Sequence, residues 1–208
     1  MLKALATTVR TWMLVPAKAL HTSSGGRITP NFITFVSLTG HILVVWALCT
    51  NRLLLAAVSL IFFGLMDSLD GALARIQNSS TLQGMFNDAV SDRAKEVLLY
   101  SGLTYYVLHF TQNTGVAWLP TAVLGMSLLV SYTKAKGEMA VAGLKKSDPQ
   151  LLNRAFADGI ARYEVRMAVV IIGLIFSAVV TSLWILLGLV CITALQRYIR
   201  IQKVLQNV

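Results

Sequence analysis

Three long stretches of the chain carry no Asp, Glu, Lys or Arg, and they predict where membrane-spanning helices lie. They are residues 28–51, 97–133 and 167–196, with 24, 37 and 30 residues. An α-helix rises 1.5 Å per residue, and about 20 apolar residues are needed to cross a bilayer. The first stretch therefore predicts one helix over about 31–50. We place a second helix after it, over about 53–76. The other two stretches are long enough to fold back on themselves.

Polar residues divide the two longer stretches. The cluster Gln112-Asn113-Thr114-Gly115 predicts a turn between helices over about 86–110 and 116–136. In the last stretch we place the turn at Thr181-Ser182, with a helix on each side that extends into the charged flanks. The pattern as a whole predicts an all-α integral membrane protein with six transmembrane helices.

Composition and charge agree with a membrane protein. Hydrophobic residues make up 56% of the 208 residues and charged residues only 13%, which is too apolar for a soluble domain of this length. If the N-terminus is cytoplasmic, 17 of the 18 Lys and Arg residues fall on the cytoplasmic side. The net charge of +9 then favours anionic membrane lipids as partners. The chain carries no motif for nucleic acid, and we expect none to bind.

The first 26 residues differ from the rest. They are basic and acid-free, with apolar residues at helical spacing, and they end in Ser23-Ser24-Gly25-Gly26. We interpret residues 1–26 as an amphipathic interfacial helix and hinge before a six-helix domain over 27–208. A cleaved targeting peptide is the alternative. We expect a multi-pass protein of the plasma (inner) membrane with its N-terminus and active site on the cytoplasmic side; the N-terminal segment leaves a mitochondrial inner membrane open.

Four aspartates gather between residues 67 and 92. Asp67 and Asp70 are three residues apart at the end of one predicted helix, and Asp88 and Asp92 are four apart at the start of the next. Each pair therefore shares a helix face, and a short hairpin between the helices brings the pairs together. Carboxylates at the edge of a membrane are costly and thus functional candidates. Divalent cations would compensate their charge.

Hard oxygen ligands select Mg²⁺, Mn²⁺ or Ca²⁺, and a pair of such ions is the usual device for clamping a phosphate during displacement. The residues between the acids suit that reaction. Gly71, Gly84 and Ala74 leave helix backbone open to a nucleotide or phosphate, and Arg75 adds a cation.

Two other interpretations of the aspartates must be weighed. One is a structural salt-bridge cluster with Arg75, Arg93 and Lys95, which leaves the small residues unexplained. The other is a divalent-metal transporter, whose acids would sit near the bilayer midplane in broken helices. Here the acids cluster within a turn or two of the cytoplasmic end, and no inverted repeat is visible.

The complete pattern is Asp67-x2-Asp70-Gly71-x2-Ala74-Arg75-x8-Gly84-x3-Asp88-x3-Asp92. It resembles the signature of the CDP-alcohol phosphatidyltransferases. The resemblance implies a six-helix membrane enzyme, usually a homodimer, that displaces CMP from a CDP-linked lipid such as CDP-diacylglycerol with a hydroxyl nucleophile. We expect two ions, Mg²⁺ or Mn²⁺, as cofactors.

The resemblance also assigns roles. Asp67, Asp70 and Asp88 would bind the metals, and Asp92 would both bind metal and act as the catalytic general base. The residues bordering the CDP-lipid would be Gly71, Ala74, Arg75 and Gly84, together with Pro30, Asn31 and Thr34, which resemble the Pro-Asn and Thr positions of relatives.

The acceptor is predicted from basic residues at the same membrane face. Ser131-Tyr132-Thr133-Lys134-Ala135-Lys136-Gly137-Glu138 resembles a segment of the actinobacterial phosphatidylinositol phosphate synthases and archaeal archaetidylinositol phosphate synthases. A phosphorylated polyol, inositol phosphate, would be the acceptor. The residues that would hold its phosphate are Lys134, Lys136, Arg154, Arg162, Arg166 and Arg197.

Two departures weigh on this acceptor. Lys136 replaces an Arg of the relatives, and the segment from Arg162 to Arg166 contains Tyr163 and an extra residue. A phosphatidylglycerophosphate synthase, which uses glycerol 3-phosphate, is the alternative. For several of the arginines, simple positive-inside topology is a second explanation.

Overall fold

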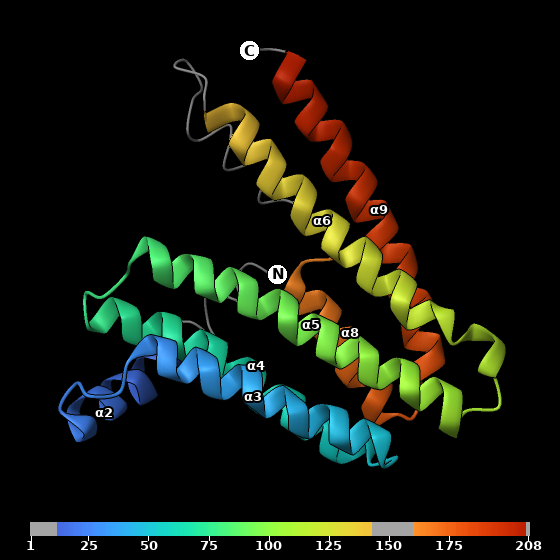
Figure 1. Cartoon of the computed structure of the whole chain (residues 1–208), viewed down its shortest axis with the longest axis horizontal. Helices are drawn as coiled ribbons and strands as arrows, with labels where there is room; N and C mark the ends of the chain where they lie inside the picture. Colours follow the sequence, from blue (N-terminus) through green and yellow to red (C-terminus); the bar gives the residue numbers. More distant parts are fainter. Residues whose placement is uncertain (1–11, 143–159, 207–208) are drawn as a thin grey trace. The chain divides into compact units, whose positions relative to one another are not determined.

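The structure is a computed structural model that describes residues 12–142 and 160–206, and all regular structure in them is helical (Figure 1). The prediction of an all-α protein is confirmed. The helices are α2 (Leu14–Ser24), α3 (Pro30–Cys49), α4 (Leu53–Ile76), α5 (Leu82–Phe110), the short 3₁₀ turn η1 (Thr114–Val116), α6 (Trp118–Ala142), α8 (Tyr163–Ile175) and α9 (Val179–Gln206).

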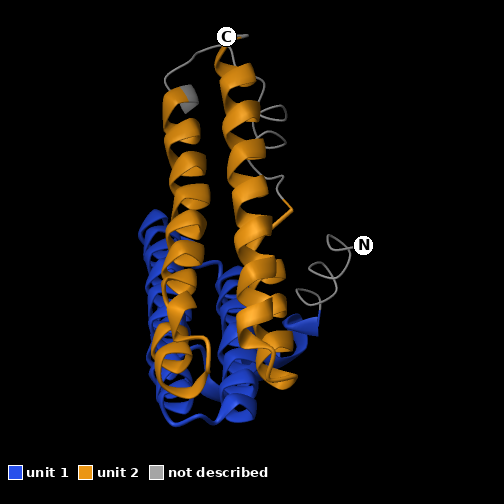
Figure 2. Cartoon of the chain, turned by 90° about the vertical axis from the view of Figure 1, so that its right-hand side faces the viewer, with its two compact units in different colours: residues 1–102 blue, residues 103–208 orange. Residues whose placement is uncertain are grey.

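The chain divides into two compact units, which we describe separately (Figure 2). Unit 1 is Met1–Gly102 and contains α2, α3, α4 and most of α5. Unit 2 is Leu103–Val208 and contains the end of α5, then η1, α6, α8 and α9.

Among the described residues, four segments are long and apolar enough to cross a membrane: Pro30–Cys49, Leu53–Ile76, Thr114–Ala140 and Val179–Gln206. The first two agree closely with the predicted helices and the third overlaps one, which supports a membrane protein; the fourth begins before the predicted turn at Thr181-Ser182. Helix α8 has 13 residues and spans about 20 Å, against a hydrocarbon core of about 30 Å. The count of six crossings therefore stays a prediction.

In unit 1, α3 and α4 lie side by side (Figure 1). Thr29 caps α3 by accepting a hydrogen bond from the Phe32 amide at 3.3 Å, and Pro30 occupies the first turn, where its missing N–H costs nothing. A side chain at Gly40 would run into the ring of Phe63 on α4. This close approach holds the face of α3 that carries Thr34 and Ser37 against α4.

A tight turn joins α4 to α5, as the sequence predicts. Asn78 adopts a left-handed conformation with φ of 50°, and the Ser79 amide donates to the Ala74 carbonyl at 3.0 Å, which closes the end of α4. The Thr81 hydroxyl accepts from the Gly84 amide at 3.0 Å and caps α5. Because the turn is short, the aspartates at the end of α4 face those at the start of α5.

Helix α2 covers part of the predicted N-terminal segment. It ends at Gly25, whose φ of 59° is left-handed, so the hinge lies where the sequence places it. The helix packs on α4, and the side-chain amide of Gln77 after α4 donates to the Ile28 carbonyl at 2.8 Å. Residues 1–11 lie outside the described residues, so an interfacial helix over the whole segment stays a prediction.

In unit 2, α6 and α8 each pack against α9, with α6 running alongside it (Figure 1). The predicted turn at 112–115 is confirmed, because α5 ends at Phe110 and α6 begins at Trp118. The turn predicted at Thr181-Ser182 is wrong: the chain turns between Ile175 and Val179.

Contacts between α8 and α9 explain the earlier turn. The Ala178 amide donates to the Gly173 carbonyl at 2.8 Å, and Ser177 takes a left-handed φ of 54°. Because Gly173 has no side chain, Ser182 packs directly against it inside the helix pair. Ser182 therefore serves the packing of α9 rather than a turn.

Candidate functional site

The two aspartate pairs meet at a buried lysine. Lys95 lies one turn after Asp92 on α5, and its side chain is 0% exposed. Its ammonium nitrogen is 2.5 Å from Asp67 Oδ1 on α4 and 3.7 Å from Asp92 Oδ1. The hairpin thus brings one member of each predicted pair to the same cation.

Helix α3 supplies hydroxyls to the aspartates of α4. Thr34 donates to Asp70 Oδ2 at 2.6 Å, and Ser37 lies 2.8 Å from Asp67 Oδ1. Both hydroxyl residues and Asp70 are buried, whereas the Asp67 and Asp92 side chains keep 16% and 28% of their surface exposed. The site therefore opens toward Asp67 and Asp92.

One carboxylate oxygen of Asp67 makes no hydrogen bond with the described residues. Asp67 Oδ2 is buried and has no hydrogen-bond partner among the described residues, although Oδ1 of the same group contacts both Ser37 and Lys95. A buried carboxylate oxygen without a partner is costly unless a cation approaches it. The oxygen-only donor set and this unused oxygen fit a hard divalent cation.

The carboxylates line the site but do not surround a single metal position. Within residues 12–142 and 160–206, no three His, Cys, Asp or Glu side chains are gathered tightly enough to enclose a metal ion. Asp88 is exposed on α5, one turn before Asp92. Lys95 stands between Asp67 and Asp92, so part of the negative charge is already compensated from inside the protein.

The two glycines of the signature differ in what surrounds them. A side-chain carbon at Gly71 would meet only Arg75 Nη1, at 3.8 Å. At Gly84 it would lie 3.2 Å from the Thr81 hydroxyl and 3.8 Å from Asn31 Oδ1, so the starts of α3 and α5 come together here.

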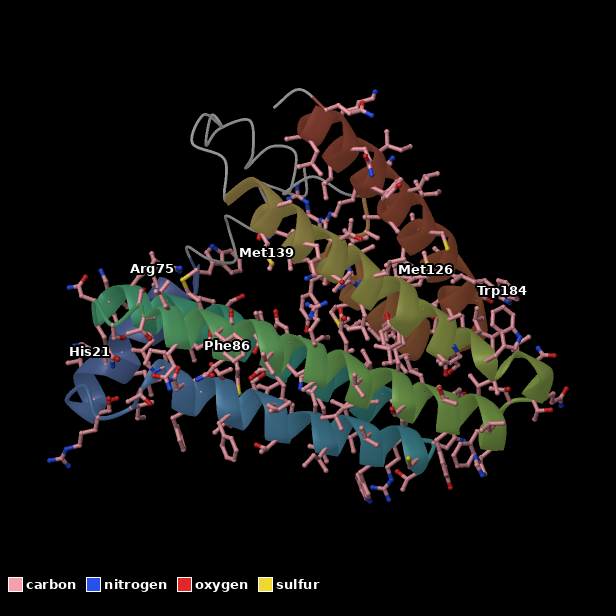
Figure 3. The ribbon with its side chains drawn as sticks, turned by 45° about the horizontal axis from the view of Figure 1, so that its top comes forward. His21, Arg75, Phe86, Met126, Met139 and Trp184 are labelled. Atoms are coloured by element: carbon pink, nitrogen blue, oxygen red, sulfur yellow. The ribbon has the colours of Figure 1, made fainter. Side chains whose placement is uncertain are left out.

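Near the end of α4, Ala74 is half-buried and Arg75 is exposed. Figure 3 shows Arg75 at the same end of unit 1 as His21 of α2. Pro30 lies half-buried in the first turn of α3, and its carbonyl accepts a hydrogen bond from Thr34 at 3.2 Å.

The basic residues predicted for the acceptor lie in unit 2, and three of them are close to one another. Arg162 and Arg166 lie near enough to Arg197 for their charges to act on it. Arg197 is buried and donates to the Val130 carbonyl at 2.8 Å, and Arg166 is buried and donates to the Ala161 carbonyl at 3.1 Å.

The other basic residues predicted for the acceptor are not part of this arginine cluster. Lys134 and Lys136 are exposed; Lys134 is 3.6 Å from Glu138, and Lys136 lies 5.8 Å from the ring centre of Tyr132. Arg154 lies outside the described residues. A cavity of about 280 Å³ in unit 2, between Tyr106, Phe110 and the turn before α9, contains none of the predicted site residues.

Two residues at the aspartates were not predicted as site residues. Ser37 follows Thr34 by three residues, so both lie on the face of α3 that meets the Asp67 and Asp70 pair. Lys95 entered only the salt-bridge interpretation, which is realised in part: Arg93 is 3.8 Å from Asp92 and 2.8 Å from Glu96. The three-residue spacing was the available signal for both.

The sequence between residues 27 and 196 matches the model of one protein family, the CDP-alcohol phosphatidyltransferases. The chain belongs to the CDP-alcohol phosphatidyltransferase family. This confirms the resemblance drawn from the aspartate spacing, and with it an enzyme of this class.

Several curated proteins are similar to the chain. An archaetidylinositol phosphate synthase of Pyrococcus horikoshii is 28% identical over 181 residues, covering 86% of each protein. A phosphatidylinositol phosphate synthase of Mycobacteroides abscessus is 27% identical over 179 residues, covering 81% of this chain and 75% of that one. An uncharacterised protein of Aquifex aeolicus is 37% identical over 118 residues, and the matched part spans 56% of this chain and 60% of that protein.

Solved structures share the fold. The crystal structure of Mycobacterium tuberculosis phosphatidylinositol phosphate synthase with manganese and citrate has a TM-score of 0.77 at 24% identity, covering 91% of this chain and 88% of that one. The same enzyme with CDP-diacylglycerol bound has a TM-score of 0.76 and covers 91% of this chain and 92% of that one.

Proposed function

We propose that the protein transfers a phosphatidyl group from CDP-diacylglycerol to the hydroxyl of a phosphorylated polyol, inositol phosphate, and releases CMP. One observation carries the proposal: carboxylates from α4 and α5 meet at the buried Lys95, where one oxygen of Asp67 has no hydrogen-bond partner among the described residues. Gly71 of the same signature leaves space on α4 beside it, and Gly84 lets the start of α5 approach Asn31 of α3.

Asp67, Asp70, Asp88 and Asp92 would hold two divalent ions, Mg²⁺ or Mn²⁺. The oxygen-only donor set supports this, as does the manganese complex of the mycobacterial relative. Bound ions would neutralise the diphosphate and acidify a hydroxyl beside it. The hydroxyls of Thr34 and Ser37 would fix the orientation of the carboxylates on α4.

The CDP portion of the donor would lie over the small residues of the site. Gly71, Ala74 and Gly84 would allow it close to the helix backbones, and Arg75 would pair with its phosphates. Pro30, Asn31 and Thr34 would border the nucleotide from α3; the proximity of Asn31 to Gly84 supports this. The relative with CDP-diacylglycerol bound supports the same donor.

Asp92 would act as the general base in the transfer. Its carboxylate would take the proton of the acceptor hydroxyl while the hydroxyl oxygen bonds to the phosphorus that carries the lipid. The bond from that phosphorus to the bridging oxygen of CMP breaks, and CMP leaves with the electron pair. Positioning and charge neutralisation would supply most of the rate enhancement.

The phosphate of the acceptor would be held by Lys134, Lys136, Arg154, Arg162, Arg166 and Arg197. The charges of Arg162 and Arg166 act on Arg197, and among the described residues Glu138 is the acidic neighbour that opposes them, so the net positive charge there supports binding of an anion. The names of the relatives from Pyrococcus and Mycobacteroides favour an inositol phosphate over glycerol 3-phosphate.

We also propose that the chain crosses the membrane six times, with the N-terminal segment lying on the membrane surface. The active site and N-terminus would face the cytoplasm across a plasma membrane, and the functional form would be a homodimer. The concentration of Lys and Arg in the predicted cytoplasmic loops supports this orientation.

The decisive experiment is a reconstituted transfer assay. The purified chain is supplied with CDP-diacylglycerol and Mg²⁺ or Mn²⁺, and inositol phosphate, glycerol 3-phosphate, inositol and serine are compared by CMP release and lipid product mass. We expect product with inositol phosphate and none after chelation of the metal. Product with glycerol 3-phosphate alone would transfer the assignment to phosphatidylglycerophosphate synthesis. No CMP release with any acceptor, together with metal flux in vesicles, would overturn the enzyme itself.

A further inference from the structure

Lys95 is a charged side chain placed wholly inside the acidic site. It is among the largest fully buried side chains of the described residues, and its ammonium lies between carboxylates of two helices. A buried ammonium is expensive unless it is paired and hydrogen-bonded. Asp67 and Asp92 supply that pairing, and the lysine in turn ties α5 to α4.

The contacts of Asp67 are divided between its two oxygens. Oδ1 contacts both the Ser37 hydroxyl and the Lys95 ammonium, whereas Oδ2 is the buried oxygen without a partner among the described residues. The lysine thus takes up one oxygen of a predicted metal ligand and leaves the other available. A cation arriving at Oδ2 would stand close to a fixed positive charge.

We propose that Lys95 is an internal counter-cation of the metal site, which joins Asp67 to Asp92 in the metal-free protein and lowers the affinity of the site for divalent ions. The inference rests on the proposed function, because it assumes that these aspartates bind metal. Without Lys95, neighbouring carboxylates would repel one another until metal arrived. With it, the hairpin is held together beforehand and bound metal is released more readily.

The test is a titration of Mn²⁺ into the full chain in detergent, with free Mn²⁺ followed by its electron paramagnetic resonance signal. Lys95→Met keeps an unbranched side chain of similar length and removes the charge. We expect Mn²⁺ to bind roughly tenfold tighter, because even at the dielectric of water a unit charge about 6 Å from a dication costs about that factor. The metal-free variant should unfold at a lower temperature, and Mn²⁺ should raise that temperature more than in the wild type.

Three variants separate charge from geometry. Ser37→Ala removes a neutral contact with the same Asp67 oxygen and should not tighten Mn²⁺ binding. Lys95→Arg keeps the charge and should bind as the wild type does. Lys18→Met makes the same substitution at an exposed lysine of α2 and should change nothing. If Lys95→Met does not fold, Lys95→Gln decides with the same titration.

The proposal is overturned if the neutral Lys95 variant binds Mn²⁺ no more tightly than the wild type, or if Ser37→Ala tightens binding equally. Either result would leave Lys95 as a packing contact. A wild-type chain that binds no Mn²⁺ at all would instead overturn the metal-dependent function together with this inference. Because binding is measured without any acceptor, a wrong acceptor does not affect the outcome.

Discussion

Asp92 is placed differently from Asp70, the buried aspartate of α4. Asp70 is 6% exposed and bonded to Thr34, while the Asp92 side chain is 28% exposed and lies 3.7 Å from the Lys95 ammonium. A general base must be accessible to the acceptor hydroxyl that arrives from solvent, and here it must also lie beside the proposed metal ions. Of Asp67, Asp70 and Asp92, Asp92 has the most exposed side chain.

The variant Asp92→Asn tests this role. The amide has nearly the same shape but cannot accept the hydroxyl proton, so CMP release should fall by roughly 10²- to 10⁴-fold while CDP-diacylglycerol binding is largely kept. Turnover and lipid binding are measured on the same preparation. Glu164→Gln, the same chemical change at an exposed residue of α8, should leave CMP release unchanged. Equal loss of turnover and binding would make Asp92 a structural ligand instead.

A substitution at Thr34 tests how much its hydrogen bond to Asp70 contributes to stability. Thr34→Val keeps the shape and removes the donor 2.6 Å from Asp70 Oδ2, which leaves a buried carboxylate with one partner fewer. The free energy of unfolding should fall by about 1–3 kcal/mol. Thr39→Val is the matched control, because that exposed hydroxyl contacts only backbone carbonyls of α3. Denaturant unfolding in detergent measures both, and similar losses would show that the Asp70 contact has no special weight.

Residues of the site could be predicted where their identity and spacing both carry meaning. The aspartates are scarce acids in an apolar chain, and the glycines stand at fixed intervals from them, so the sequence alone indicates a site. Ser37 and Lys95 are ordinary residue types whose roles arise from contacts across 30 and 28 positions of sequence. Their three-residue spacing from Thr34 and Asp92 places them on the same helix faces as those residues, but it does not indicate that these faces meet Asp67.

At the scale of elements, helix boundaries were predicted correctly where a local sequence pattern marks them. The turns at 77–81 and 111–117 contain polar residues or glycine, and both were predicted. The turn before α9 reads Phe176-Ser177-Ala178, with no glycine or proline to mark it, and the nearest polar pair misled the prediction by a few residues. Beside this turn, Gly173 inside α8 lets Ser182 of α9 pack directly against it.

Gly173→Ala therefore tests the α8 and α9 pair. The added methyl group would overlap the Ser182 hydroxyl and its Cβ atom, and the Cβ cannot move without the backbone of α9, so stability should fall by about 1–3 kcal/mol. At Gly188 on α9 an added carbon meets nothing within 4 Å. Gly188→Ala should be neutral or stabilise by up to about 1 kcal/mol, because alanine favours helix. Thermal unfolding of both variants compares them, and an unharmed Gly173→Ala would remove this account of the helix packing.

At the scale of the whole molecule, the proposed fold crosses the membrane six times. Among the described residues four segments qualify by length and composition, and α5 carries the charges of the site in its first half. The proposed orientation places the α4–α5 turn in the cytoplasm, because the aspartates must meet a water-soluble acceptor there. The turn at 111–117 and the turn before α9 would then both lie outside.

Single cysteines measure this arrangement directly. In a background with Cys49→Ser and Cys191→Ser, exposed residues in three turns are replaced one at a time by Ser79→Cys, Asn113→Cys and Phe176→Cys. A membrane-impermeant maleimide added to right-side-out vesicles should label the variants at 113 and 176, and the variant at 79 only after the vesicles are opened. Labelling at 113 but not at 176 would show that α8 and α9 do not form two crossings, and the count would fall below six. Labelling at 79 alone would invert the orientation and place the aspartates on the wrong side for a cytoplasmic acceptor.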